Sequence, residues 1–354
     1  MQINQFVPTI NPGDAVSNNI LGLREILVEN GYKSDIYAKH IHAELKNKVK
    51  SVSKYRGNTS NLLFYHFAIA GMDFTDSVIK FPDTKILVYH NITPAEFFYN
   101  YDNRSYFGCK KGREELAKIS KFFDLGIGDS NYNRQELEEI GFKNTAVLPI
   151  FIDTSAERTT DLKLDLELSN NGKTKLLFVG RIAPNKRQED IVKIFYLYNK
   201  YINSNSQLYI VGSEHTLKYA EQLKNLVSDL GLSGDVIFPG HISQKALHSY
   251  YNNADVFLCM SEHEGFCVPL LEAMRHGVPI IAYDSSAVTE TLGNSGITIG
   301  KKDYAALAEL VNIVVGDQNV RREIISAQIE RLMSFDKRIV SKKLLDIIAD
   351  ISSP

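Results

Sequence analysis

The chain has 354 residues, of which 44% are hydrophobic and 23% charged, a composition typical of a globular protein with about two domains. A formal net charge of −2 argues against a nucleic-acid-binding protein, and three cysteines, an odd number, argue against a disulfide framework. We therefore expect a reducing, cytoplasmic compartment. The first residues, MQINQFVPTI, lack the pattern of a signal peptide, and no apolar stretch reaches the length of a bilayer span.

In the first half of the chain, short apolar runs alternate with amphipathic segments. Helical patterns at 18–31 and 133–141 each end at a glycine and lie between strands, as β-α-β crossovers require. Asp129 or Ser130 is the expected N-cap of the second helix. The predicted strands are INQFV (3–7), SDIYA (34–38), NLLFYHF (61–67), KILVYHN (85–91), DLGIGDS (124–130) and TAVLPI (145–150).

A basic run without an acidic residue follows the second predicted strand. Such a run most often forms a solvated face, and the alternative is a peripheral contact with an anionic membrane at its inner face. Its members are Lys46, Lys48, Lys50, Lys54 and Arg56.

Residues 152–172 are polar and contain the turn signal NNG, so we expect a linker that includes at most a short strand or helix. The alternation restarts after this linker, and the continuous apolar character of its strands predicts parallel pairing with both faces buried. Residues 303–350 have a helical pattern throughout. The predicted strands are KLLFVG (175–180), QLYIVG (207–212), VIFPG (236–240), VFLCMS (256–261), PIIAYD (279–284) and ITIG (297–300).

This order predicts an α/β fold of two Rossmann-like, doubly wound domains that face a cleft. The N-terminal domain would cover 1–151 and the C-terminal domain 173–335, with a last helix in 336–354. Ligands of such sheets bind at the carboxyl ends of the strands, so the polar residues that follow each strand are the candidates for a binding site.

The stretch SEHEGFCVPLLEAM (261–274) carries two carboxylates, Glu264 and Glu272, eight positions apart. Pro269 between them suits the first turn of a helix, whose N-terminus attracts anions such as phosphate. The carboxylates can accept hydrogen bonds from sugar hydroxyls. Acidic residues are also common in first helical turns for electrostatic reasons alone, so the pair does not by itself identify a site.

The stretch GRIAPNKRQED (180–190) places Arg181 and Lys186 after the first strand of the C-terminal domain. Two cations at this position can neutralise a diphosphate, although each could also be an ordinary solvated side chain. Because both stretches follow strands of one sheet, we expect them to lie at the same edge.

The N-terminal domain offers two further candidates. The stretch NPGDAVSNN (11–19) leads from a strand into a helix, so the backbone around Gly13 can approach a phosphate, unless it is a plain turn capped by Asn or Ser. His90 lies at a strand end, where a single histidine is more often structural than catalytic, so both roles stay open for it. His66, in the preceding strand, is a weaker candidate of the same kind.

Gly180, Arg181 and Lys186, followed by SEHEGFCVPLLEAMRHGVPIIA (261–282), resemble the retaining GT-B glycosyltransferases of family four, the glycosyl transferases group 1. The resemblance is dense from about residue 175 to 300 and looser in the N-terminal half. It implies a GT-B fold in which the last helix crosses back onto the N-terminal domain. This chain departs from the family at Cys267, where glycine is usual, and at Asp14, where a second glycine is often found.

The resemblance also implies roles for single residues. Arg181 and Lys186 would hold the donor diphosphate, Glu264 would lie against the donor sugar, and Glu272 would bind the ribose hydroxyls. The backbone at Gly265, Phe266 and Cys267 would approach the sugar or phosphate. His90 would reach the donor sugar or the acceptor, and His241 would line the nucleobase pocket.

The absence of several sequence motifs argues against metal-dependent and NAD-dependent chemistry. No D-x-D, HExxH or EF-hand pattern occurs, so we expect no metal and no cofactor beyond the nucleotide-sugar donor. The GxGxxG fingerprint is missing as well, which argues against NAD chemistry.

The function that we expect is hexose transfer from GDP-mannose or a UDP-hexose to a glycan or lipid-linked hydroxyl, in cell-surface polysaccharide synthesis. Two alternatives stay open at this point. One is another GT-B enzyme, an epimerase or a phosphorylase, and the other is a non-catalytic subunit that binds a sugar nucleotide.

Overall fold

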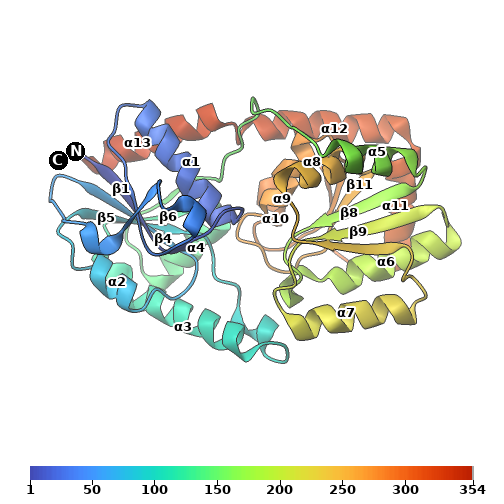
Figure 1. Cartoon of the computed structure of the whole chain (residues 1–354), viewed down its shortest axis with the longest axis horizontal. Helices are drawn as coiled ribbons and strands as arrows, with labels where there is room; N and C mark the ends of the chain where they lie inside the picture. Colours follow the sequence, from blue (N-terminus) through green and yellow to red (C-terminus); the bar gives the residue numbers. More distant parts are fainter. Residues whose placement is uncertain (353–354) are drawn as a thin grey trace. The chain divides into compact units, whose positions relative to one another are not determined.

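The computed structural model describes residues 1–352, which divide into two compact units. The N-terminal unit comprises 1–96, 104–151 and the segment that begins at Lys337, and the C-terminal unit comprises 97–103 and 152–336. Each unit is a parallel sheet with helices on both faces (Figure 1). Both units are therefore doubly wound, as the alternation of strands and helices predicts.

The N-terminal sheet has the order β3-β2-β1-β4-β5-β6-β7, and all neighbouring strands are parallel. Strand β4 is buried at every position, as expected for a central strand covered on both faces. The direction of winding reverses between β1 and β4, which makes their carboxyl ends the switch point of this sheet. The strands are β1 (Ile3–Ile10), β2 (Ile36–Ile41), β3 (Val49–Ser51), β4 (Leu62–Phe67), β5 (Thr84–Tyr89), β6 (Leu125–Gly128) and β7 (Thr145–Val147).

Two groups of helices cover this sheet. Helices α2, α3 and α4 share an aromatic-rich buried cluster with one face. Helices α1 and α13 share a second cluster with the other face, to which Leu23, Val340 and Leu344 belong. The last helix of the chain thus packs within the N-terminal unit. The helices are α1 (Ala15–Glu29), α2 (Asp73–Val78), α3 (Asn103–Ile119), α4 (Asn131–Ile140) and α13 (Lys337–Ser352).

The C-terminal sheet has the order β10-β9-β8-β11-β12-β13, again with parallel neighbours. Its winding reverses between β8 and β11, so the loops that follow these two strands define the expected ligand site. The strands are β8 (Thr174–Val179), β9 (Ser206–Val211), β10 (Val236–Gly240), β11 (Val256–Cys259), β12 (Ile280–Tyr283) and β13 (Ile297–Ile299).

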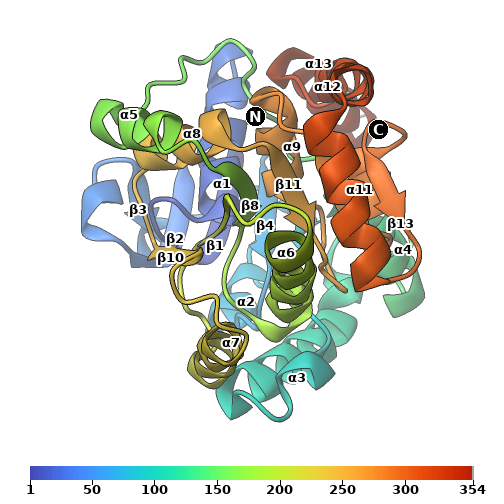
Figure 2. The ribbon, with the colours of Figure 1, turned by 90° about the vertical axis from the view of Figure 1, so that its right-hand side faces the viewer.

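Helices α6, α7 and α11 cover one face of this sheet through a single buried cluster, and α6 and α11 lie side by side in both views (Figures 1 and 2). Helices α8 and α9 contact strands β8 and β12, and α12 contacts α9 and α11. No helix of residues 1–352 is long and apolar enough to cross a membrane. The helices are α5 (Leu162–Asn170), α6 (Gln188–Tyr201), α7 (Leu217–Asp229), α8 (Gln244–Asn253), α9 (Val268–Arg275), α10 (Val288–Leu292), α11 (Tyr304–Gly316) and α12 (Gln318–Met333).

Three details differ from the sequence-based expectation. The segment 152–172 is part of the C-terminal unit, because its helix α5 packs on α8. The segment 97–103 also belongs to that unit, although the sequence places it inside the N-terminal domain. Within the basic run, Val49–Ser51 forms the edge strand β3, and Lys50 pairs with Asp35 at 2.7 Å, so the run is partly neutralised.

The end of β9 leaves no room for a side chain at Gly212. A Cβ atom there would lie 2.1 Å from the carbonyl oxygen of Gly180, and the φ angle is +144°. We expect Gly212→Ala to lower the free energy of unfolding by about 3 kcal/mol in urea denaturation, because the backbone at the strand ends must move. Gly234→Ala is the control, since its Cβ would meet nothing within 4 Å. Equal losses in both variants would contradict this reading.

Candidate donor-binding site at the switch point of the C-terminal sheet

The loops that follow β8 and β11 are joined at the switch point. The first loop contains a 3-10 turn (Pro184–Lys186), and the second contains Glu264. Asn185 links them twice: its Nδ2 donates to the carbonyl of His263 (3.0 Å), and its own carbonyl accepts from the amide of Glu262 (2.9 Å). Since Asn185 is buried, these bonds are shielded from water and hold the two loops in register.

Lys186 and Glu264 form the central contact of the site. The ammonium lies 2.6 Å from both carboxylate oxygens, and the two side chains are 17% and 9% exposed. The backbone of Glu264 is held as well, because its amide donates to Ser286 Oγ (2.7 Å) and its carbonyl accepts from the amide of Ala287 (3.3 Å). The carboxylate is therefore fixed from its backbone and from its side chain.

Arg181 is exposed, and within residues 1–352 its guanidinium makes no hydrogen bond or ion pair, so it can accept an anion without losing a partner. Burial lowers the pKa of His215, and the positive charge of Arg181 lowers it further. His215 follows β9 and therefore lies close to Arg181. His215 was not among the predicted site residues, although its position after a strand could have indicated it.

A second charged network lies beside the Glu264 loop. Lys302 contacts Asp190 (2.7 Å) and Glu262 (3.0 Å), and Glu262 also contacts Arg187 (2.6 Å). The Lys302 ammonium lies 4.4 Å from the centroid of the Tyr283 ring, which is a cation–π distance. Lys302 follows the last strand of the sheet, so its position could also have indicated this missed residue.

Glu272 lies on α9, whose N-cap is Cys267 in a left-handed conformation (φ +71°). Loss of solvation raises the pKa of Glu272 to about 7, while a hydrogen bond from Tyr251 Oη (3.0 Å) opposes the rise. The carboxylate is thus poorly hydrated, and further hydrogen-bond donors such as sugar hydroxyls would stabilise its ionised form.

The other predicted residues of this unit are distributed as follows. Phe266 and Cys267 are buried in the loop before α9, and the carbonyl of Phe266 accepts from Thr291 Oγ1 (2.6 Å). Gly265 precedes them in the same loop. His241 is exposed just after β10, two strands away from β8 in the sheet.

In the N-terminal unit, Gly13 lies in an exposed turn with φ +78°. Helix α1 behind it is capped by Asp14, whose Oδ2 accepts from the amide of Ser17 (3.0 Å). The cap is thus aspartate rather than Asn or Ser, and its carboxylate occupies the helix start at which a phosphate was predicted. At α4 the predicted cap is confirmed for Ser130, which accepts from the amide of Asn133 (3.1 Å).

His90 belongs to a chain of hydrogen bonds across four strands. Gln5 Nε2 donates to the Ile20 carbonyl (3.0 Å), which leaves Gln5 Oε1 to accept from His66 Nε2 (2.9 Å). His66 Nδ1 then accepts from His90 Nε2 (2.8 Å), and His90 Nδ1 faces Asp129 Oδ2 (2.8 Å).

Both ring nitrogens of His90 are therefore engaged inside the unit. Burial lowers the pKa of His66 well below its usual value, in keeping with a neutral ring. In this conformation His90 has no nitrogen for a sugar, so its predicted contact with donor or acceptor would require the chain of hydrogen bonds to open. Asp129 serves this chain of bonds and not the cap of α4.

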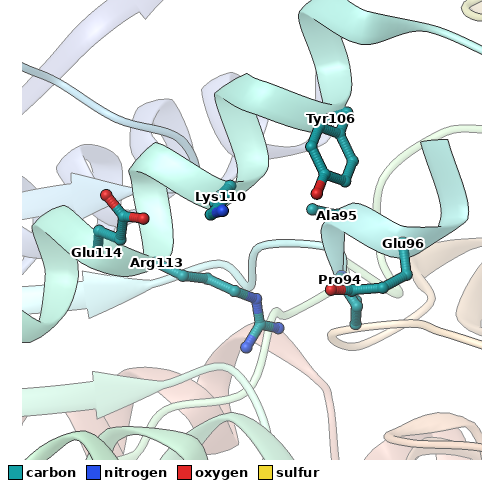
Figure 3. Close-up of a pocket in the computed structure, with 7 residues that line it drawn as sticks. All are labelled: Pro94, Ala95, Glu96, Tyr106, Lys110, Arg113 and Glu114. Atoms are coloured by element: carbon teal, nitrogen blue, oxygen red, sulfur yellow. The ribbon is translucent and has the colours of Figure 1, made fainter. Parts of the chain in front are cut away.

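The N-terminal unit also contains a pocket of about 430 Å³ between α3 and the segment 94–96 (Figure 3). Its charged lining is balanced, with two cations and two carboxylates. Arg113 is anchored there by the carbonyl of Ile92 and by Glu136 at 2.9 Å. The lining residues are Pro94, Ala95, Glu96, Tyr106, Lys110, Arg113 and Glu114.

The raised pKa of Glu272 predicts a pH dependence of stability. The native state binds the proton more tightly than the unfolded state, so stability falls as the pH rises from about 4.5 to about 7 and then levels off. Relative to Glu272→Gln, we expect the wild type to lose about 2 kcal/mol over this range, as measured by denaturation at each pH. Glu221→Gln, an exposed change on α7, should keep the wild-type profile. Parallel profiles for wild type and Glu272→Gln would refute the assignment.

Comparison with known proteins shows a similarity to glycosyltransferases. Residues 163–331 match the family described as Glycosyl transferases group 1. The chain is similar to the capsular polysaccharide biosynthesis glycosyltransferase CapM of Staphylococcus aureus, with 29% identity over 214 residues that cover 59% of this chain and 50% of CapM. It is also similar to the GDP-mannose-dependent alpha-(1-6)-phosphatidylinositol monomannoside mannosyltransferase of Mycolicibacterium smegmatis, with 28% identity over 58% of this chain and 56% of that protein. The similarity thus spans about half the length of these curated relatives.

Among solved structures, Anabaena Alr3699/HepE in complex with UDP and glucose aligns over 99% of this chain and 100% of its own, with a TM-score of 0.78 and 17% identity. Likeness at this level of identity establishes the fold, and the predicted two-domain, Rossmann-like GT-B class is confirmed. The matched segment contains Arg181, Lys186, Glu264 and Glu272. Through this segment, slightly less than half of the chain, the protein is similar to the glycosyl transferases group 1 family.

Proposed function

We propose that the chain transfers a hexose from a nucleoside-diphosphate sugar to a hydroxyl of a glycan or lipid-linked acceptor, with retention of configuration. The observation that carries this proposal is the Lys186–Glu264 contact at the switch point. It puts a cation suited to phosphate against a carboxylate suited to a sugar. The similarity to glycosyl transferases group 1, and to CapM, which is named for capsular polysaccharide biosynthesis, supports an activity in cell-surface polysaccharide synthesis.

The donor diphosphate would bind to Lys186 and to the exposed guanidinium of Arg181. A diphosphate competes with Glu264 for the Lys186 ammonium, so donor binding would loosen the ion pair and turn the carboxylate toward the sugar. The two cations neutralise charge on the leaving nucleoside diphosphate, and the proposal therefore assigns no metal ion to the diphosphate.

In the transfer step, the bond between the anomeric carbon and the diphosphate oxygen breaks while the acceptor hydroxyl attacks the same face. The hydroxyl proton passes to the leaving phosphate. Glu264 would stabilise the positive charge that develops on the sugar without forming a covalent adduct. Glu272 would accept hydrogen bonds from the ribose hydroxyls and so act in donor binding rather than in bond cleavage.

The nucleobase of the donor and the acceptor are proposed from the relatives and from the N-terminal pocket. The Anabaena structure contains UDP and glucose, and the mycobacterial relative is named for GDP-mannose, so UDP-hexoses and GDP-mannose are the donors to test first. For the acceptor, we propose the N-terminal unit, in which the charged side chains that line the pocket between α3 and 94–96 would bind a hydroxylated ligand.

Substitution of the central pair tests the proposal. We expect Glu264→Gln and Lys186→Ala each to lower the rate of sugar transfer by a factor on the order of 100 to 1,000, because each removes charge stabilisation from the transition state. The measurement is transfer from labelled UDP- and GDP-sugars to a lipid-linked or glycan acceptor, with unfolding curves to verify that the variants are folded.

The control is a second ion pair of the same unit, Lys173–Asp235 (3.0 Å), whose residues precede β8 and β10 at the amino ends of the strands. Lys173→Ala and Asp235→Asn should leave transfer within about threefold of the wild type, since surface pairs contribute little. Full activity of both Glu264→Gln and Lys186→Ala would disprove the mechanism. Donor binding without transfer or hydrolysis would instead favour a non-catalytic subunit.

Nucleotide binding can be measured without knowing the acceptor. We expect either UDP or GDP to raise the melting temperature more than ADP does, because a ligand that binds only the native state stabilises it. Lys186→Ala should reduce that shift, whereas Lys173→Ala should not. An absence of any shift with all three nucleotides at millimolar concentration would contradict a donor site in this chain.

A further inference from the structure

Two buried cysteines, eight positions apart in the sequence, lie close to each other and to Glu264. Cys259 ends strand β11, and Cys267 is the residue at which this chain departs from the usual glycine. Their Sγ atoms lie 3.9 Å apart, and both residues are buried, with exposures of 1% and 7%. A carboxylate oxygen of Glu264 completes a group whose three ligand atoms all lie within 4.8 Å of one another.

We propose that Cys259, Cys267 and Glu264 form a binding site for a thiophilic divalent cation of the Zn²⁺ class. Two thiolates on a tetrahedral zinc ion lie about 3.8 Å apart, given a Zn–S bond of about 2.3 Å, and the observed sulfur separation is close to this value. Sulfur ligands select Zn²⁺ or Cd²⁺ over Mg²⁺ and Mn²⁺, so this site differs in kind from a metal that bridges a diphosphate. Three protein ligands leave a fourth position open.

The surroundings hold these ligands in place before any ion arrives. Ser285 Oγ donates to the carbonyl of Ser261 (2.6 Å), and Ser286 Oγ accepts from the amide of Glu264. These two hydrogen bonds hold the loop between the cysteines against the segment 285–286. Ser261 Oγ lies 3.6 Å from the sulfur of Cys259 and can donate to it once it is a thiolate. Such outer contacts orient metal ligands and raise affinity.

The charges of the site balance when the divalent ion is bound. Binding removes the Sγ–H protons of both cysteines, which pass to solvent, and the two thiolates offset the charge of the divalent ion. The charges of Glu264 and Lys186 still sum to zero, although the two side chains no longer form an ion pair. The ion competes with Lys186 for the carboxylate, and the ammonium must turn away as the metal–oxygen bond forms.

This geometry links the metal to the proposed function. Glu264 cannot bind the metal ion and contact the donor sugar at the same time. A bound ion would therefore block sugar transfer. This consequence rests on the proposed function, whereas the metal site itself rests on the three ligands alone. A binding measurement and an activity measurement can therefore fail separately.

The test is titration of the full, reduced chain with Co²⁺, followed by competition with Zn²⁺. We expect one Co²⁺ per chain, with the thiolate-to-cobalt charge-transfer band of a sulfur-ligated ion, and displacement by one equivalent of Zn²⁺. Cys259→Ser and, separately, Cys267→Gly should each weaken binding by a factor on the order of 100 or more, since even outer-shell changes cost 10- to 100-fold. Glycine also suits the left-handed backbone at 267, so this variant should fold.

Cys109→Ser is the matched control, because Cys109 lies on α3, whereas the site is built in the C-terminal unit. It should bind Co²⁺ like the wild type. The proposal is overturned if the wild type binds no stoichiometric Co²⁺ with a thiolate band, or if Cys259→Ser and Cys267→Gly bind as tightly as the wild type. It is also overturned if thiol titration shows that Cys259 and Cys267 form a disulfide under the same reducing conditions.

The functional consequence has its own readout. Zn²⁺ at one equivalent should inhibit sugar transfer by the wild type and by Cys109→Ser, but not by Cys259→Ser relative to its own metal-free rate. Binding with no inhibition would keep the metal site and remove its link to Glu264 chemistry. Inhibition that is equal in Cys259→Ser would place the inhibitory ion elsewhere.

Discussion

The ion pair between Lys186 and Glu264 is the contact on which the C-terminal site depends. Each charge is largely removed from water, and such a pair is stable only when its partners are held in a favourable geometry. Asn185 supplies that geometry by bonding the loop after β8 to the loop after β11. A cation and a carboxylate that are far apart in the chain are thus preorganised at one point of the sheet.

The parallel sheet explains why so many polar side chains gather there. All strands of the C-terminal unit end at the same edge, and the two strands at the switch point diverge in their connections. Arg181, His215 and Lys302 each follow a different strand and reach this edge. The Cys259–Cys267 pair lies below Glu264 for the same reason, since one sulfur ends a strand and the other begins the next helix.

Most of the fold was predictable because long buried strands and capped helices have strong local signals. All of the predicted strands are present, with small differences at their ends. The short strand β3 was missed because three residues within a basic run carry no period-2 pattern. The sequence also did not predict that 97–103 belongs to the C-terminal unit, because that assignment depends on long-range contacts and not on local propensity. The helix α5 within the predicted linker gives little sequence signal, because only Leu168 is buried while Leu162 and Leu166 are exposed.

The sequence by itself determined the fold class, the two groups of strands and the identity of the charged residues of the family motif. These properties depend on hydrophobic periodicity and on residues close together in the chain. Only the tertiary structure decided which of these residues meet. It joined Lys186 to Glu264 over 78 positions, engaged both nitrogens of His90 within the N-terminal unit, and brought Cys259 to Cys267. The reason is physical: such contacts are set by strand order and loop packing, which no local pattern encodes.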